Sequence, residues 1–134
     1  MAAKVNGKAW QKKACTSCIG GGSALKVNYD DRDFFVVTGQ DHDFGLDIAI
    51  VITSLKRTGT YTLSSRNLDY ARLYKESDAK YYYTSTKNTG QVTITKLDLV
   101  NKIISGTFNL TAEDENNPVN TLKVTDGRFD VKYQ

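Results

Sequence analysis

Hydrophobic and polar residues alternate with a period of two along several short stretches of the chain. The clearest stretch is residues 104–112, and alternation of this kind is typical of a strand with one buried face. Its apolar positions are Ile104, Gly106, Phe108, Leu110 and Ala112. Residues 91–99 also alternate, but the phase changes near Thr95 and Lys96, which indicates a β-bulge or burial on both faces. A short turn at residues 101–102 would join the two stretches into a hairpin.

Two glycine-containing dipeptides predict tight hairpin turns. Asn6-Gly7 lies near the N-terminus, before Trp10, which we expect in the core, and Asp126-Gly127 lies near the C-terminus. Both dipeptides favour the primed turns of two-residue hairpins because they tolerate positive φ. The pairs predicted across the second turn are Thr125 with Arg128, Val124 with Phe129, Lys123 with Asp130 and Leu122 with Val131. In this register the apolar pairs share one face and the oppositely charged pair lies on the other.

Six further short runs are rich in β-branched and aromatic residues and predict strands. They are residues 24–29, 34–38, 46–53, 60–63, 70–74 and 80–85. No stretch of eleven or more residues has a convincing helical period, so the crossover helices that a parallel sheet needs are missing. About nine or ten short strands separated by turn signals indicate an all-β fold. We expect a single domain spanning residues 1–134 that folds as an antiparallel two-sheet β-sandwich. Closure of the sheets into a barrel is the alternative.

The composition is that of a globular protein, with 40% hydrophobic and 25% charged residues. The 18 basic and 15 acidic residues are interspersed. A nucleic-acid-binding face needs clustered cations, so we expect no nucleic-acid partner. The longest aliphatic run, residues 48–52, is far shorter than the ~20 residues that span a bilayer. No signal peptide is visible, so the chain is expected to be either cytoplasmic or separated from an export signal.

Cys15 and Cys18 form a C-x-x-C motif, for which several interpretations stay open. A redox centre needs a helix directly after the motif, and the glycines at residues 20–22 begin a helix poorly. A zinc site needs four ligands, and the chain offers one histidine, His42, so any metal would have to be shared with another molecule. In an exported protein a local disulfide is the simplest interpretation, and inert thiols are the other.

Asp41 and Asp43 flank His42 and are weak candidates for a metal site or an acid/base cluster. Hard cations take carboxylate oxygens from loops. Aspartate is also a common turn residue, and no complete calcium-loop spacing occurs, so a solvated turn is the favoured interpretation. The G-x-S-x-G nucleophile motif does not occur either. The sequence therefore predicts no catalytic residue, no metal and no cofactor.

Tyrosine is the most frequent aromatic residue, and three tyrosines are consecutive in one predicted strand. On a strand Tyr81 and Tyr83 face one way and Tyr82 the other, and Tyr74 ends the preceding predicted strand. Exposed aromatic rings can stack on sugars or anchor a protein partner, so we single out Tyr74, Tyr81 and Tyr83 as candidate ligand-binding residues. The alternative is that these rings only cover a sheet face. Further tyrosines in predicted strands are Tyr61 and Tyr70.

Residues 92–112 and 124–133 resemble a family of small Bacteroidetes envelope lipoproteins of unknown function. The most specific shared elements are residues 105–108 and 127–131, and residues 5–10 resemble the start of the mature domain in that family. The resemblance implies an exported protein at the outer membrane, in the periplasm or on the cell surface. A lipid would tether it near its N-terminus, through a signal and cysteine that this sequence lacks. The shared residues are typical of strand, turn and core positions, so the resemblance supplies no catalytic residues.

Taken together, these features favour a non-catalytic domain of the cell envelope that binds an envelope protein or a glycan. A carbohydrate-binding module that uses surface tyrosines is the more specific alternative. It requires the tyrosines to lie coplanar on one open sheet face, and burial of the tyrosines would exclude it. An enzyme is the third class, and it would need His42 or paired carboxylates converging in a pocket.

Overall fold

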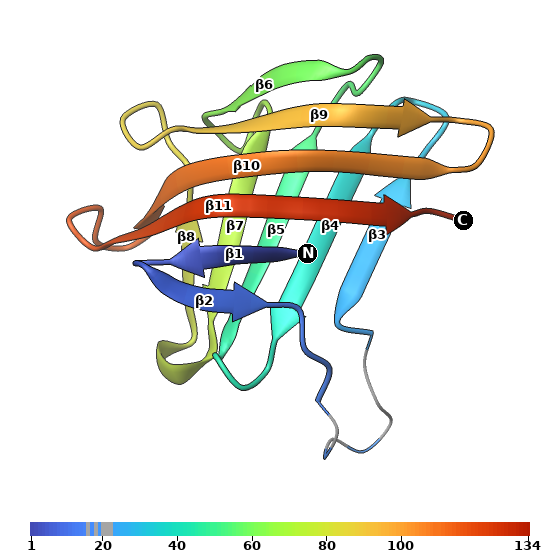
Figure 1. Cartoon of the computed structure of the whole chain (residues 1–134). Helices are drawn as coiled ribbons and strands as arrows, with labels where there is room; N and C mark the ends of the chain where they lie inside the picture. Colours follow the sequence, from blue (N-terminus) through green and yellow to red (C-terminus); the bar gives the residue numbers. More distant parts are fainter. Residues whose placement is uncertain (16, 18, 20–22) are drawn as a thin grey trace.

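The computed structural model describes residues 1–15, 17, 19 and 23–134, and its eleven strands form one antiparallel sheet that curls into two facing layers (Figure 1). The front layer contains β6 (Gly59–Leu63), β9 (Gly90–Asp98), β10 (Ile103–Asp114), β11 (Thr121–Lys132), β1 (Ala2–Val5) and β2 (Lys8–Gln11). The back layer contains β8 (Lys80–Tyr83), β7 (Tyr70–Lys75), β5 (Leu46–Ile52), β4 (Phe35–Asp41) and β3 (Leu25–Tyr29), and a 3₁₀ turn, η1 (Glu76–Asp78), connects β7 to β8. The predicted all-β, antiparallel, two-layered class is therefore confirmed.

The two layers are continuous through β10. This strand pairs with β9 and β11 along most of its length, and its last two residues, Glu113 and Asp114, pair with Tyr83 and Tyr82 of β8. Asp114 is fully buried at this corner and accepts a hydrogen bond from Lys80 Nζ at 3.0 Å. The corner therefore fixes β8, and the side chains that β8 carries, to the long central strand of the front layer.

The hydrophobic core lies between the layers, where front strands run across back strands (Figure 1). Ile48, Ile50 and Ile52 of β5 are fully buried because alternate residues of a strand share one face. Phe35 of β4 and Phe129 of β11 meet across the core with ring centroids 5.9 Å apart. The apolar residues of the predicted strands thus lie on the inward faces of the two layers.

Trp10 closes one end of the core, as predicted. Its side chain is 1% exposed, and its indole N–H donates to the backbone oxygen of Leu46 at 2.9 Å. Gly39 of β4 makes room for the ring, because a Cβ at that position would lie 2.7 Å from the indole. These contacts fasten β2, the edge strand of the front layer, to β4 and β5 of the back layer.

The hairpin predicted at Asp126-Gly127 is wrong. Both residues lie inside β11, one strand that pairs with β10 on one side and with β1 on the other. The register with β10 shifts between Phe108 and Leu110, so the dipeptide forms a β-bulge in place of a turn. Asp126 supplies the positive φ, 52°, and Gly127 leaves space for the ring of Phe108. A dipeptide that tolerates positive φ suits bulges as well as turns, and the pairing on both sides decides between them.

The other local predictions made from turns and phase are confirmed. Asn6 and Gly7 have φ values of 47° and 81° and join β1 to β2 as a two-residue hairpin. The register of β9 against β10 shifts where Ser105 faces Lys96, which leaves Thr95 as the bulged residue. Among the described residues no helix reaches the length and apolarity needed to cross a membrane.

Candidate functional site

The outward side of the back layer carries a cluster of tyrosines and faces away from the viewer in Figure 1. Outward residues alternate with buried ones along β7 and β8, as the strand period requires. Tyr74 pairs with Tyr81 across these strands, and Arg72 pairs with Tyr83. We call this surface the tyrosine face and define it by Arg66, Tyr70, Arg72, Tyr74, Tyr81 and Tyr83.

The four rings of the tyrosine face form a continuous chain. Ring centroids are 6.4 Å apart from Tyr70 to Tyr83, 6.2 Å from Tyr83 to Tyr81 and 4.8 Å from Tyr81 to Tyr74. Successive ring planes differ by 42°, 29° and 41°. Tyr81 is 37% exposed, and the other three rings are half-buried. The rings therefore present one aromatic surface to solvent, with Tyr81 at its most accessible point.

Two guanidinium groups lie on this aromatic surface. Arg66, from the loop before β7, sits 4.2 Å from the centroid of the Tyr83 ring, and Arg72 sits 5.7 Å from that of Tyr81. A cation over the face of an aromatic ring is attracted by the ring quadrupole, typically by about 0.5–1 kcal/mol at exposed sites. The tyrosine face is therefore both aromatic and cationic.

Asp47 of β5 lies beside Tyr74 in the sheet register and adds an acidic group to the border of this surface, where Glu115 also lies 3.9 Å from Arg66. Gln40 Nε2 donates to its Oδ2 at 2.9 Å. Its other oxygen, Oδ1, is buried and has no hydrogen-bond partner among the described residues. An unpaired buried acceptor costs about 1–3 kcal/mol, a cost that the fold bears at this position.

The structure brings together the three tyrosines that the sequence singled out, Tyr74, Tyr81 and Tyr83. Tyr82 points into the core and is 5% exposed, as the strand period predicts. Tyr61 lies apart from the face and donates its hydroxyl to the backbone oxygen of Arg57. The other candidates from the sequence, Asp41, Asp43 and Cys15, are not part of this face.

Sequence reasoning missed three residues of this surface. Arg72 stands two residues from Tyr74 in the same predicted strand, so the period of two could have placed it there. No comparable signal exists for Asp47 or Arg66. Asp47 reaches the surface because β5 pairs with β7, although β6 separates them in the chain. Arg66 belongs to a loop.

His42 and Asp43 lie in the exposed turn after β4, in line with the favoured interpretation as a solvated turn, whereas Asp41 is the last residue of β4. Asp41 is buried and accepts hydrogen bonds from the backbone N–H groups of Gln11 and Phe44. Asp43 pairs with the ammonium group of Lys13. No three acidic, histidine or cysteine side chains in the described part of the chain lie close enough to hold a metal ion. The disulfide expected between Cys15 and Cys18 involves a residue, Cys18, that lies outside the described residues.

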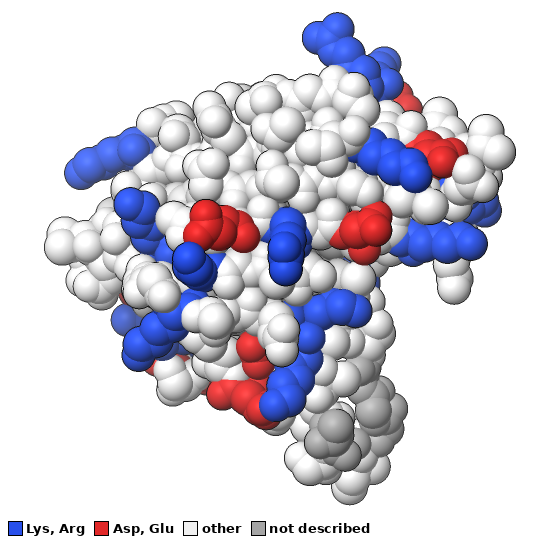
Figure 2. Space-filling view, in the orientation of Figure 1, with Lys and Arg blue, Asp and Glu red and all other residues white. Residues whose placement is uncertain are grey.

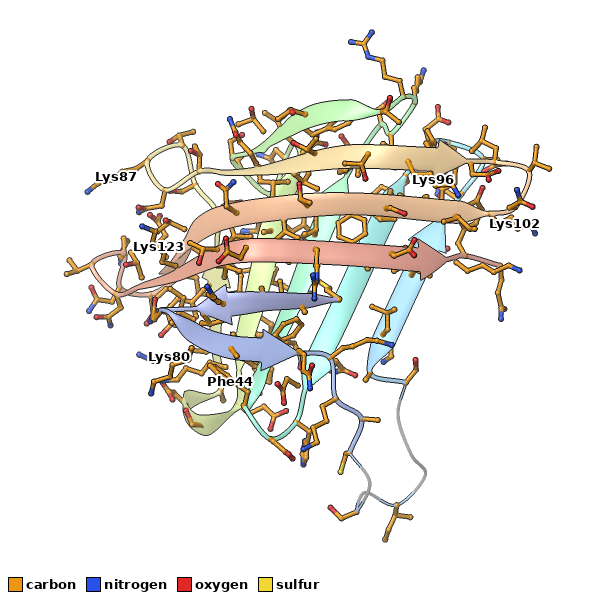
Figure 3. The ribbon with its side chains drawn as sticks, viewed as in Figure 1. Phe44, Lys80, Lys87, Lys96, Lys102 and Lys123 are labelled. Atoms are coloured by element: carbon orange, nitrogen blue, oxygen red, sulfur yellow. The ribbon has the colours of Figure 1, made fainter. Side chains whose placement is uncertain are left out.

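The outward side of the front layer is a weaker candidate for a binding surface. Figure 2 shows acidic and basic side chains interspersed over it. A hollow of about 720 Å³ over β1 and β2 is lined by charges that pair with one another, Lys4 with Asp126 at 3.0 Å and Lys13 with Asp43. Other cations lie apart at the two ends of β9 (Figure 3): Lys87 at one end, Lys96 and Lys102 at the other. This layer shows neither an aromatic surface nor a concentration of one charge.

Comparison with known proteins places nearly the whole chain in one family domain. Residues 1–131 match DUF6252, described as a domain of unknown function. No curated protein and no solved structure matches the chain. The matched region includes every residue of the tyrosine face, so this surface lies within the family domain.

Proposed function

The chain belongs to the DUF6252 family of unknown function, and we propose that it is a non-catalytic binding module whose ligand surface is the tyrosine face. The ligand class that we propose is a glycan. The observation that carries this proposal is the continuous chain of four tyrosine rings on one open sheet face. The rings share one open sheet face, as a carbohydrate-binding surface requires, but they are not coplanar, since successive planes differ by 42°, 29° and 41°.

The chemistry of tyrosine suits a sugar ligand. A tyrosine ring offers an apolar surface to the C–H groups of a pyranose, and its hydroxyl can exchange hydrogen bonds with sugar hydroxyls. The strands hold the rings in place, so little ordering entropy is lost on binding. Rings on rigid strands therefore favour a ligand that stacks across them.

A purely structural role accounts for some of these rings but not for Tyr81. Ala49 and Val51 lie on the outward side of β5 and are 3% and 5% exposed, so neighbouring side chains cover them. Tyr70 and Tyr74 pair with β5 and can provide that cover. Tyr81 lies one strand further away and remains 37% exposed. Its ring is available to a ligand.

A binding screen tests the proposal directly. The purified domain is titrated against a panel of polysaccharides and envelope extracts, with and without calcium. We expect saturable binding to at least one glycan that the Tyr81→Ala/Tyr83→Ala variant loses by tenfold or more. Tyr81→Phe, which keeps the ring, should retain most of the affinity. Saturable glycan binding that the double alanine variant leaves unchanged would contradict the assignment of the face.

The non-catalytic part of the proposal rests on the roles of the candidate acid/base residues. The carboxylate of Asp41 holds backbone N–H groups and that of Asp43 pairs with Lys13. His42 lies at the surface with Nδ1 3.7 Å from Glu76 Oε1. A bound polysaccharide should therefore keep its length on prolonged incubation, and an increase in reducing ends would contradict this part.

We further propose that the protein is exported and lipid-tethered in the cell envelope. The support is the resemblance of residues 92–112 and 124–133 to envelope lipoproteins, and a glycan ligand fits that compartment. Fractionation of native cells checks this proposal. Recovery of the protein in the membrane fraction and its release by detergent are expected, and recovery in the cytosol would contradict it.

A further inference from the structure

We propose that the glycan recognised by the tyrosine face is acidic, with a uronate carboxylate bound by Arg72 and the sugar ring stacked on Tyr81. This inference rests on the proposed function and names its ligand class. It follows from the position, charge and pairing of the two arginines, and from the polar groups that surround them.

Arg72 is placed to bind an anion. Its side chain is exposed, it projects from the middle of β7 between Tyr70 and Tyr74, and its guanidinium lies 5.7 Å from the Tyr81 centroid. Among the described residues no carboxylate lies within ion-pair distance of it, whereas Arg66 has Glu115 at 3.9 Å. Arginine presents a planar fork of donors that matches a carboxylate in a bidentate pair. The charge of Arg72 is therefore available to a ligand.

The neighbours of Arg72 favour a sugar acid over other anions. Arg72 and Tyr81 are diagonal neighbours on adjacent strands, so a carboxylate on Arg72 brings the attached ring over Tyr81. The tyrosines that share this face carry hydroxyls, which can exchange hydrogen bonds with sugar hydroxyls. One monosaccharide unit thus meets a cation, an aromatic surface and hydrogen-bond acceptors.

Single-stranded nucleic acid is the competing ligand, since it also combines aromatic stacking with positive charge. Binding a phosphate backbone needs a positively charged path along the surface. Here the register places Asp47 next to Tyr74, and Glu115 lies within ion-pair distance of Arg66. The face therefore offers the single guanidinium of Arg72 rather than a row of positive charges. A single cation suits a ligand that carries one carboxylate on each sugar unit better than a continuous phosphate backbone.

The test compares acidic polymers with the same polymers after methyl esterification of their carboxyl groups. Polygalacturonate, alginate and hyaluronate are the probes, and a mixed-sequence single-stranded oligonucleotide is the competitor. We expect the wild type to bind at least one of the three acidic polymers tenfold or more tightly than its ester and than the oligonucleotide. Arg72→Gln should lose tenfold or more, and Arg72→Lys should recover only part of the loss because lysine lacks the fork.

Lys102→Gln is the matched control, because it removes one exposed positive charge far from the tyrosine face. This variant should change the affinity less than twofold. Equal losses in Arg72→Gln and Lys102→Gln would show general charge attraction and overturn the inference. Equal binding to acid and ester forms that Tyr81→Ala abolishes and Arg72→Gln does not would overturn the acidic ligand and keep the proposed function. No binding to any of these polymers would overturn the acidic ligand and leave the proposed function to the wider glycan panel, whereas tighter binding of the oligonucleotide would overturn both.

Discussion

Gly127 shows how much of this fold depends on a single position. A Cβ at Gly127 would lie 2.5 Å from two ring atoms of Phe108, too close for any side chain unless the ring moves. Gly127→Ala is therefore expected to lower the free energy of unfolding by about 1–3 kcal/mol through overpacking. Urea denaturation followed by the fluorescence of the buried Trp10 measures the loss.

A substitution of Phe108, the residue that an alanine at position 127 would clash with, provides the control. Phe108→Leu removes the ring and carries its own cost, but it should relieve the clash with an alanine at position 127. The double variant is thus expected to be more stable than the sum of the two single effects predicts. Strictly additive losses would show that the contact between Gly127 and Phe108 does not limit packing.

Strands could be predicted from the sequence better than their partners. Short alternating runs identified the strands, and the phase change identified the bulge at Thr95, because both signals are local. The error at Asp126-Gly127 arose because turn and bulge share the same local signal, and β11 continues through the dipeptide, paired with β10 from residue 121 to 132 and with β1 from residue 124 to 128. The residue types determine that a positive φ is tolerated at this position, and the pairing of the strand with its neighbours determines whether the position forms a turn or a bulge.

The residues of the candidate site also fall into two groups, those that a local pattern predicts and those that depend on long-range pairing or on a loop. The period of two along β8 correctly predicted that Tyr81 and Tyr83 share a face. Asp47 lies next to Tyr74 only because β5 pairs with β7, and no local pattern predicts that pairing. The contact of Arg66 with Tyr83 depends on a loop conformation. The aromatic residues of the face, and Arg72 in the same strand as Tyr74, could thus be predicted from the period of two, whereas Asp47 and Arg66 could not.

At the scale of one strand, the bulge in β9 predicts an asymmetry between two single-residue deletions. Removing Thr95 abolishes the bulge but leaves Val92, Ile94 and Leu97 on the inward side, so we expect a loss of about 1 kcal/mol or less. Removing Thr93 turns Val92 outward and should cost about 3 kcal/mol or more, because a slip of one residue reverses the faces. Thermal unfolding of the two variants provides the comparison, and equal losses would contradict the register of β9.

For the molecule as a whole, the buried corner between β10 and β8 predicts loss of stability in acid. The backbone N–H of Asn116 and then the ammonium of Lys80 (Figure 3) hold the pKa of Asp114 below its usual value. A carboxyl group whose pKa is lower in the folded state stabilises the fold above the unfolded pKa, near 3.9, and the contribution disappears as the pH falls through the folded pKa.

The midpoint of thermal unfolding should therefore fall as the pH drops below about 4. Asp78 and Asp98 act in the same direction, since Lys75 and the backbone of Asn101 respectively lower the pKa of each. Asp114→Asn is expected to lower the midpoint at neutral pH and to flatten its decrease in acid. A variant that keeps the full acid dependence of the wild type would show that Asp114 is not among the groups responsible.

The tyrosine face should be where this molecule contacts its ligand. Titration of the ¹⁵N-labelled domain with a galacturonate oligosaccharide, followed through its backbone amide signals, tests this location residue by residue. We predict shift changes concentrated on β7 and β8 and on the neighbouring part of β5, with the front layer unaffected. Shift changes centred on β1, β2 and β11, where the hollow of the front layer lies, would contradict it.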